Sequence, residues 1–169
     1  MKNRRGTIQL LTLMLALVSC TAQTKVFTSP NSAMEPTILE GEKFTAEMQP
    51  FRPSRGDLVI VSHEGVLLIK CVIGISGDIV EGHNAEVFVN GTALHEPYIQ
   101  HIGKPVGSMD KFGPTKVPPG ELFVMGDNRD YSLDSRDSRF GMVSLSDVKG
   151  RPGKVVVSPD PKRLNMTLR

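Results

Sequence analysis

Short apolar runs separated by glycine, proline and asparagine constrain the fold of this chain more than any other feature. The sequence holds 16 Gly and 12 Pro in 169 residues, and no stretch after the N-terminus keeps a helical period over three turns. Apolar, β-branched runs bounded by such turn signals are typical of β-strands. They lie at residues 57–62, 66–75, 79–80, 87–89, 122–125 and 155–157. We therefore expect a mostly β protein of folded-over antiparallel sheets, or an open barrel.

Turn signals also divide the chain. Asn90-Gly91 follows one apolar run and predicts a tight hairpin. Residues 95–118 contain four prolines and predict a short irregular insertion. The length fits one domain. We expect an export signal at 1–19, a tether at 20–28 and the β domain at 29–169.

The first 19 residues have the composition of an export signal. Lys2, Arg4 and Arg5 precede an apolar stretch at residues 8–18. A charged start before a short apolar stretch is typical of a secretory signal, and this stretch is shorter than the roughly 20 residues that a membrane span needs. Residues 17–20, Leu-Val-Ser-Cys, are similar to a lipobox, which predicts lipid on Cys20 and cleavage before it. The alternatives are an uncleaved anchor and an ordinary cleaved signal.

Net charge excludes one class of partner. The formal charge is +2, but three positive residues lie in the first 19, which leaves 17 basic against 18 acidic residues and a net charge of −1. A nucleic-acid partner therefore has no electrostatic support. The four histidines show no metal-ligand spacing, and we expect no metal and no cofactor. We expect a membrane-associated protein on the extracytoplasmic (periplasmic) face, anchored through lipid on Cys20.

Lys70 interrupts an apolar run that continues on both sides of it. A lysine there either reaches water from a half-buried strand or lies buried. Burial disfavours the ammonium form and lowers the lysine pKa, which makes a usable general base. The run alone favours the solvent-facing lysine.

Two other segments concentrate polar residues. Residues 126–136 read Gly-Asp-Asn-Arg-Asp-Tyr-Ser-Leu-Asp-Ser-Arg, with five charged residues in eleven positions. Alone, this segment indicates a turn held by internal ion pairs and Asx-type hydrogen bonds. Residues 31–37 read Asn-Ser-Ala-Met-Glu-Pro-Thr.

Together and in this order, residues 31–37, 70–78 and 126–136 resemble the bacterial type I signal peptidases (leader peptidases). The resemblance runs from about Ser29 to Pro159, and the nearly complete segment 126–136 is its most specific part. It implies a serine endopeptidase that removes signal peptides from exported proteins at the membrane. The implied partners are those signal peptides, with small residues at positions −1 and −3 of the cleavage site.

The resemblance also implies a role for individual residues. In this family a serine before methionine attacks the peptide bond and a lysine is its general base, together a Ser/Lys dyad. Lys70 falls at the base and Ser132 at the hydroxyl that orients it. The remaining implied positions are the floor of the site (Asp134, Arg136, Asp127 and Arg129), the loop that presents the nucleophile (Met34 and Pro36) and the oxyanion hole (the N–H of Ala33 and a polar group at Asn31).

Ala33, which directly precedes Met34, occupies the nucleophile position, and a methyl group cannot attack a carbonyl. Three interpretations remain open. Ser32 attacks instead from a loop shifted by one residue, or the protein is catalytically silent and binds peptides or partners in the inherited groove, or the chain is an inactivated variant of a serine enzyme. Loss of the nucleophile costs serine proteases about 10⁶ in turnover. Retention of Lys70 favours retained chemistry, because a buried lysine is costly to keep. A lipoprotein with a purely structural role would need neither base nor groove.

Overall fold

The computed structural model describes residues 23–99 and 111–168, which form eleven strands and three short 3-10 helices. The proposed export signal and Cys20 lie outside these residues. The strands are β1 (Gln23–Thr28), β2 (Lys43–Met48), β3 (Leu58–His63), β4 (Val66–Ile75), β5 (Ile79–His83), β6 (Glu86–Val89), β7 (Thr92–Ala93), β8 (Phe112–Lys116), β9 (Glu121–Met125), β10 (Val143–Ser144) and β11 (Val148–Val157). The helices are η1 (Ser32–Met34), η3 (Leu145–Asp147) and η4 (Pro161–Arg163). No helix within the described ranges is long and apolar enough to cross a membrane.

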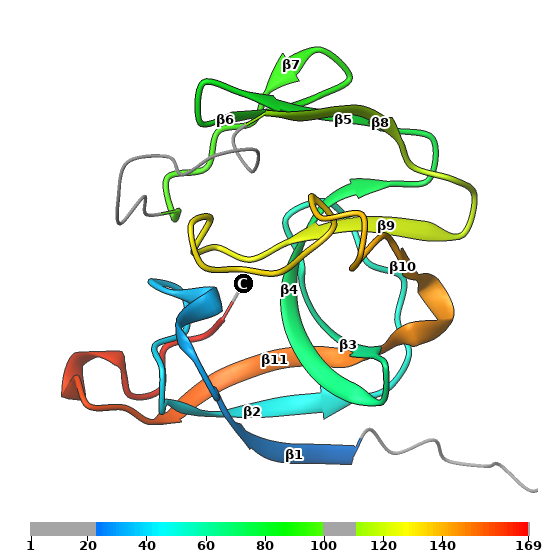
Figure 1. Cartoon of the computed structure of the whole chain (residues 1–169). Helices are drawn as coiled ribbons and strands as arrows, with labels where there is room; N and C mark the ends of the chain where they lie inside the picture. The colour runs from blue at the N-terminus through cyan, green and yellow to red at the C-terminus, as the bar shows by residue number, and fades with distance from the viewer. Residues whose placement is uncertain (1–22, 100–110, 169) are drawn as a thin grey trace, which may run out of the picture.

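Two open sheets make up the domain (Figure 1). The larger has the strand order β1-β2-β11-β3-β4-β9-β10, and the smaller has the order β7-β6-β5-β8. Every strand pair is antiparallel. Figure 1 shows the small sheet above the large one, with the 126–136 loop in yellow between them. The mostly β, antiparallel and unclosed fold predicted from the sequence is confirmed.

The large sheet buries side chains on both of its faces. On β3, Leu58 and Ile60 belong to one core cluster, whereas Val59 and Val61 belong to the other. Successive side chains of a strand point to opposite faces, so one apolar run supplies both clusters. A strand buried on both faces reads as a continuous apolar run rather than as an alternation, which is the pattern of residues 57–62.

Two predicted boundaries are wrong. Gln23–Thr28, assigned to the tether, form β1, which pairs with β2 over its whole length. β1 is almost entirely exposed and its ladder attaches it to the sheet, so no apolar pattern marked it. Phe112–Lys116, assigned to the irregular insertion, form β8 at the edge of the small sheet. Pro114 fits there because an edge strand needs only half of its backbone groups for the ladder.

The hairpin predicted at Asn90-Gly91 joins β6 to β7. Both turn residues have positive φ angles, 54° for Asn90 and 77° for Gly91. These angles suit the two-residue turn whose twist matches that of the flanking strands.

Candidate active site and peptide pocket

Lys70 is buried, with only 4% of its surface exposed. It lies in the middle of β4, opposite Val59 in the ladder with β3. Its amine donates a hydrogen bond to Ser132 Oγ at 2.7 Å and lies 5.8 Å from the ring centre of Phe140. The prediction of a solvent-facing lysine, which the apolar run alone favoured, is therefore wrong, and the alternative of a buried Lys70 is confirmed.

Burial lowers the pKa of the Lys70 amine below its ordinary value. The positive charge of Arg136 acts in the same direction, whereas the carboxylates of Asp134 and Asp127 oppose it. The net shift is downward, so a larger fraction of the amine is neutral at a given pH than for a solvated lysine. A neutral amine can accept a proton, which is the requirement for a general base.

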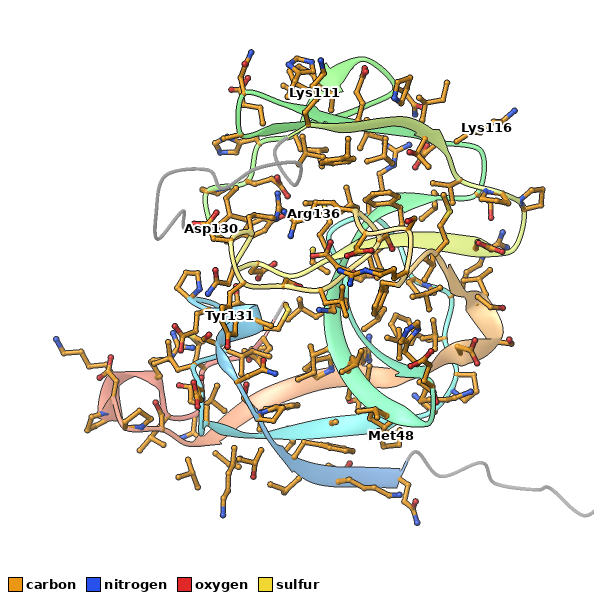
Figure 2. All side chains as sticks on the ribbon, in the orientation of Figure 1. Met48, Lys111, Lys116, Asp130, Tyr131 and Arg136 are labelled. Carbon is orange, nitrogen blue, oxygen red and sulfur yellow. The ribbon has the colours of Figure 1, made fainter. Side chains whose placement is uncertain are left out.

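The loop of residues 126–136 holds Ser132 against Lys70. Asp134, fully buried, accepts the backbone N–H of Gly126 at 2.9 Å. Arg136 donates to both carboxylate oxygens of Asp134, at 2.8 and 2.9 Å. This buried ion pair closes the loop around Ser132, as the internal pairing read from the sequence predicted. Figure 2 labels Asp130, Tyr131 and Arg136 on this loop, and Tyr131 is 68% exposed.

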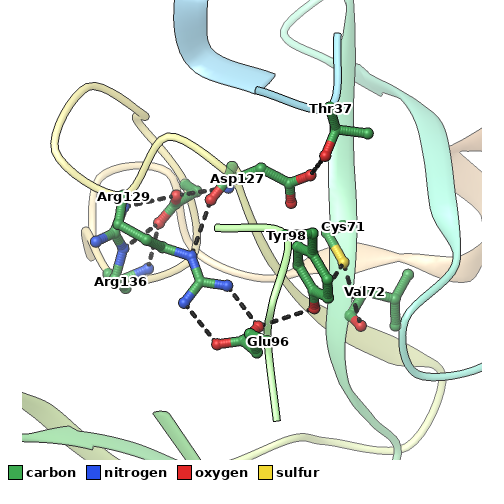
Figure 3. Close-up of polar contacts among 10 residues, drawn as sticks. Thr37, Cys71, Val72, Glu96, Tyr98, Asp127, Arg129 and Arg136 are labelled. Carbon is green, nitrogen blue, oxygen red and sulfur yellow. Dashed lines mark hydrogen bonds and ion pairs between the residues drawn. The ribbon is translucent and has the colours of Figure 1, made fainter. Parts of the chain in front are cut away.

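Glu96, which the sequence did not single out, pairs with Arg129 beneath this loop (Figure 3). The two side chains are 5% and 4% exposed and make two hydrogen bonds, at 2.9 and 2.6 Å. Arg129 Nε also donates to the carbonyl of Gly126 at 3.0 Å. Burial alone would lower the pKa of Arg129, but bonding and charge from Glu96 raise it above its ordinary value. The charge of Arg129, which the resemblance assigns to the floor of the site, is therefore paired in the interior with a carboxylate from the insertion.

Tyr98 extends this contact toward the strand that carries Lys70. Its hydroxyl donates to Glu96 at 2.9 Å, and it lies 4.0 Å from the sulfur of Cys71 (Figure 3). Cys71 is fully buried, in the core cluster that also contains Leu58 and Ile60.

The segment with Ala33 is fixed to the 126–136 loop through Asn128, another residue that the sequence did not single out. The backbone N–H of Asn128 donates to the carbonyl of Ala33, and its side-chain amide donates to the carbonyl of Ser32, both at 3.1 Å. Gly126 allows this close approach, because a Cβ there would overlap the Ser132 hydroxyl and lie 2.6 Å from the Ala33 carbonyl oxygen. Ala33 is thus brought beside Ser132.

The two groups that the resemblance assigns to the oxyanion hole are bonded to each other. The N–H of Ala33 donates to Asn31 Oδ1 at 3.1 Å, as part of the cap of η1. A substrate oxygen would have to take the place of this exposed side-chain oxygen to reach the N–H. Behind the same segment, the Thr37 hydroxyl donates to the buried carboxylate of Asp127 (Figure 3).

An apolar pocket of about 130 Å³ joins Ala33 to Lys70. Met34, placed in the nucleophile loop by the resemblance, is buried in its wall, whereas Ser32 is not among the lining residues. Pro36 lies on another face of the loop, in the wall of a separate hollow. The rest of the lining comes from residues 27–31, Phe44, Ile60 and residues 67–69. The pocket therefore lies between the end of β1 and the first half of β4.

Within residues 23–99 and 111–168, no group of three or more His, Cys, Asp or Glu side chains could hold a metal ion. The groups that the structure brings together at this site include the buried amine of Lys70, the Ser132 hydroxyl and the backbone around Ala33.

The fold and the site define a class of protein: an antiparallel β protein in which a small apolar pocket ends at a buried lysine that is hydrogen-bonded to a serine. Comparison with known proteins makes this class more specific. A family model described as signal peptidase, peptidase S26, matches residues 3–157. The chain therefore belongs to the signal peptidase family, as the resemblance predicted.

Individual relatives agree with this assignment. The chain is 32% identical over 160 residues to signal peptidase I P of Bacillus subtilis subsp. natto, covering 86% of this chain and 83% of that protein. It is 35% identical over 126 residues to a signal peptidase I of Bacillus amyloliquefaciens, covering 70% and 68%. A solved signal peptidase I from Enterococcus faecalis V583 has a TM-score of 0.53 and 30% identity, over 61% of this chain and 98% of that one.

Proposed function

We propose that this protein binds the signal peptides of exported proteins at a membrane, as a signal peptidase does, and that with alanine at position 33 it holds them without cleaving them. One observation carries this proposal: at position 33, where the resemblance places the nucleophile, the wall of the pocket that ends at Lys70 carries the methyl group of alanine instead of a serine hydroxyl. The binding surface and the base are present, and the attacking group is missing.

Free strand edges support an extended mode of peptide binding. Residues 66–70 of β4 pair with β3 on one side, while β9 pairs only with residues 71–75. β1 pairs with β2 alone. No strand of the described residues covers the remaining edges, and both strands contribute to the pocket wall. An extended peptide can add its backbone hydrogen bonds to such an edge and place alternate side chains in the pocket. The small volume suits the short side chains expected at −1 and −3.

Lys70, acting as a general base, would find no proton to remove at position 33. A lysine base removes the proton of a serine hydroxyl as that oxygen attacks the carbonyl. Ala33 supplies no such proton. Ser32, its neighbour, is not among the residues that line the pocket, and its carbonyl accepts hydrogen bonds from the Asn128 side chain and from the N–H of Glu35.

A second candidate is an endopeptidase that uses Ser32. It is favoured by the Lys70–Ser132 pair, because a buried amine costs stability and has no evident use in a protein that only binds. Asp134 and Arg136, which hold Ser132, also remain. This candidate requires the segment 31–34 to shift by one residue when the peptide binds.

We further propose that the protein is tethered on the extracytoplasmic face of the membrane by lipid on Cys20. The charged and apolar start of the sequence and residues 17–20 support this location. Signal peptides cross the membrane during export, so a pocket held near that face meets them there.

Binding of a fluorescent signal peptide with alanine at −1 and −3, measured by anisotropy in detergent, tests the main proposal. Leu67 lines the pocket and is 42% exposed, whereas its neighbour Val66 is 58% exposed and is not among the lining residues. Leu67→Asp should weaken binding by about tenfold, because a carboxylate in an apolar pocket loses hydration. Val66→Asp is the matched control and should bind as the wild type does. Equal loss in both variants, or a wild type that does not bind, would reject the pocket as the peptide site.

A further inference from the structure

The C-terminal segment 158–168 lies beyond residues 3–157, the part of the chain that the family model matches. It is nevertheless a folded part of the domain. After η4 the chain turns back along β11, where Val155 N–H donates to the carbonyl of Met166 at 3.0 Å and Leu168 N–H donates to that of Gly153 at 2.7 Å. Leu168 is buried in the core cluster that contains Leu58 and Ile60. Figure 1 shows this red segment passing beside the blue segment that contains η1.

Arg163, at the end of η4, connects this segment to the loop of residues 29–42. Its guanidinium donates to both carboxylate oxygens of Glu42, at 2.6 and 3.0 Å. One of its nitrogens also donates to the backbone carbonyl of Thr37 at 2.8 Å. The planar fork of arginine can make these bonds together, which the single ammonium of a lysine cannot reproduce.

Glu42 needs Arg163 because its side chain is completely buried. Burial alone would raise its pKa, but hydrogen bonds from Arg163, Ser158 and the Leu39 N–H, and the charge of Arg163, hold the pKa below its ordinary value. Glu42 is therefore a carboxylate at neutral pH, and two of its partners come from the C-terminal segment.

The loop held in this way is the one that carries Ala33. Its base is closed by hydrogen bonds between Ser29 and the carbonyl of Glu42 at 2.8 Å, and between Gly41 and the carbonyl of Ser29 at 2.9 Å. Its middle is held from two sides at Thr37: Arg163 binds the carbonyl, and Asp127 of the Ser132 loop binds the hydroxyl. The C-terminal segment and the Ser132 loop therefore both form hydrogen bonds with Thr37.

We propose that Arg163 is a positioning residue, through which the C-terminal segment fixes the loop of residues 29–42 and so the place of Ala33 beside Lys70. The segment thereby acts as a clamp on one wall of the peptide pocket. Its effect on peptide affinity rests on the proposed function, whereas its effect on the loop does not.

Hydrogen exchange of the full-length protein without peptide tests the clamp. The reporters are the amides of Glu35 and Ile38, which bond within the loop. Arg163→Lys keeps the charge and loses the fork. Glu42→Gln with Arg163→Met removes the buried charges as a pair, which avoids an unpaired carboxylate, and loses the bond to Thr37. Lys162→Ala is the control, because it removes an exposed positive charge from the same short helix.

Both Arg163 variants should exchange the loop amides about tenfold faster, with the amides of β3 and β4 unchanged and Lys162→Ala like the wild type. Peptide affinity should fall in the same two variants. Loop exchange equal to the wild type in folded variants, or a uniform increase that includes β3 and β4, would overturn the proposal. Faster loop exchange in a protein that binds no peptide would support the clamp and reject only the proposed function.

Discussion

The amine of Lys70 and the hydroxyl of Ser132 lie 2.7 Å apart, in side chains that are 4% and 3% exposed. An ammonium in this place would have lost most of its hydration. The carboxylates of Asp134 and Asp127 offset only part of that cost. The pair therefore makes the protein's stability depend on the protonation of one amine.

Lys70→Met should stabilise the folded protein at neutral pH by about 1 kcal/mol, as apolar replacements of buried charged groups often do. The folded-state pKa of Lys70 is lowered, so the cost of its charge is fully present below that pKa. The cost declines as pH rises toward the ordinary value of 10.5, because in that window the unfolded chain binds a proton that the folded chain lacks. Urea unfolding of both proteins from pH 6 to pH 10 measures the difference. A gain that does not change with pH would show that the amine titrates normally.

Glu96→Ala should cost about 3–5 kcal/mol of stability, because it leaves the charge of Arg129 buried without its carboxylate. Glu47 and Arg151 form a comparable but exposed pair, at 41% and 56% exposure. Glu47→Ala should therefore cost no more than about 1 kcal/mol. Chemical denaturation of the two variants compares these values. Similar small losses would mean that the insertion does not support the floor of the site.

Gly126→Ala should separate Ser132 from Lys70, because the new methyl would overlap the serine hydroxyl. Such overpacking typically costs about 1–3 kcal/mol. NMR titration of the labelled lysine side chain should show a changed pKa of Lys70 in this variant. Gly120→Ala is the control: its φ of 81° makes alanine strained, but no atom lies within 4 Å of the added methyl. It should lose stability without any change at Lys70, and an unchanged Lys70 in both variants would contradict the close packing at Gly126.

Local sequence patterns predicted the strands whose side chains are buried. They did not predict strands or buried side chains that depend on contacts with residues far away in the sequence. β4 was evident as an apolar run, whereas β1 is exposed and depends on its ladder with β2. The burial of Lys70 depends on Ser132, 62 residues away, so its own run could not decide between solvent and interior. Family resemblance supplied the roles proposed for Lys70 and Ser132. Glu96 was not predicted as part of the site, because no spacing rule links it to Arg129, 33 residues later in the sequence.

Cys20→Ala should release the protein from the membrane fraction and abolish its labelling with palmitate. Because β1 begins at Gln23, only Thr21 and Ala22 separate Cys20 from the sheet, and the three residue steps from Cys20 to Gln23 can span at most about 10 Å. A lipid on Cys20 would therefore hold the β domain against the bilayer. Labelling of growing cells, with fractionation of the wild type and the variant, checks this. Equal palmitate incorporation would contradict lipidation at Cys20, and release of the wild type by high salt would favour a weak peripheral attachment instead.

Ala33→Ser should create cleavage of a signal peptide, since it adds the one missing group to the wall of the pocket that ends at Lys70. Asn128 still holds the carbonyl of residue 33, and Met34 still anchors the loop in the core, so the new hydroxyl would lie where the methyl lies now. Lys70→Met in the same protein should abolish the new activity, because an apolar side chain accepts no proton. If Ser32 is the working nucleophile, the wild type should already cleave, Ser32→Ala should abolish that activity, and Ala33→Ser should add little.

Mass spectrometry of the cleavage products separates the two mechanisms. It compares six proteins: the wild type, Ala33→Ser and Ser32→Ala, each with and without Lys70→Met. Six folded but inactive proteins would contradict both, and the peptide-binding function would then be the one left to explain the pocket.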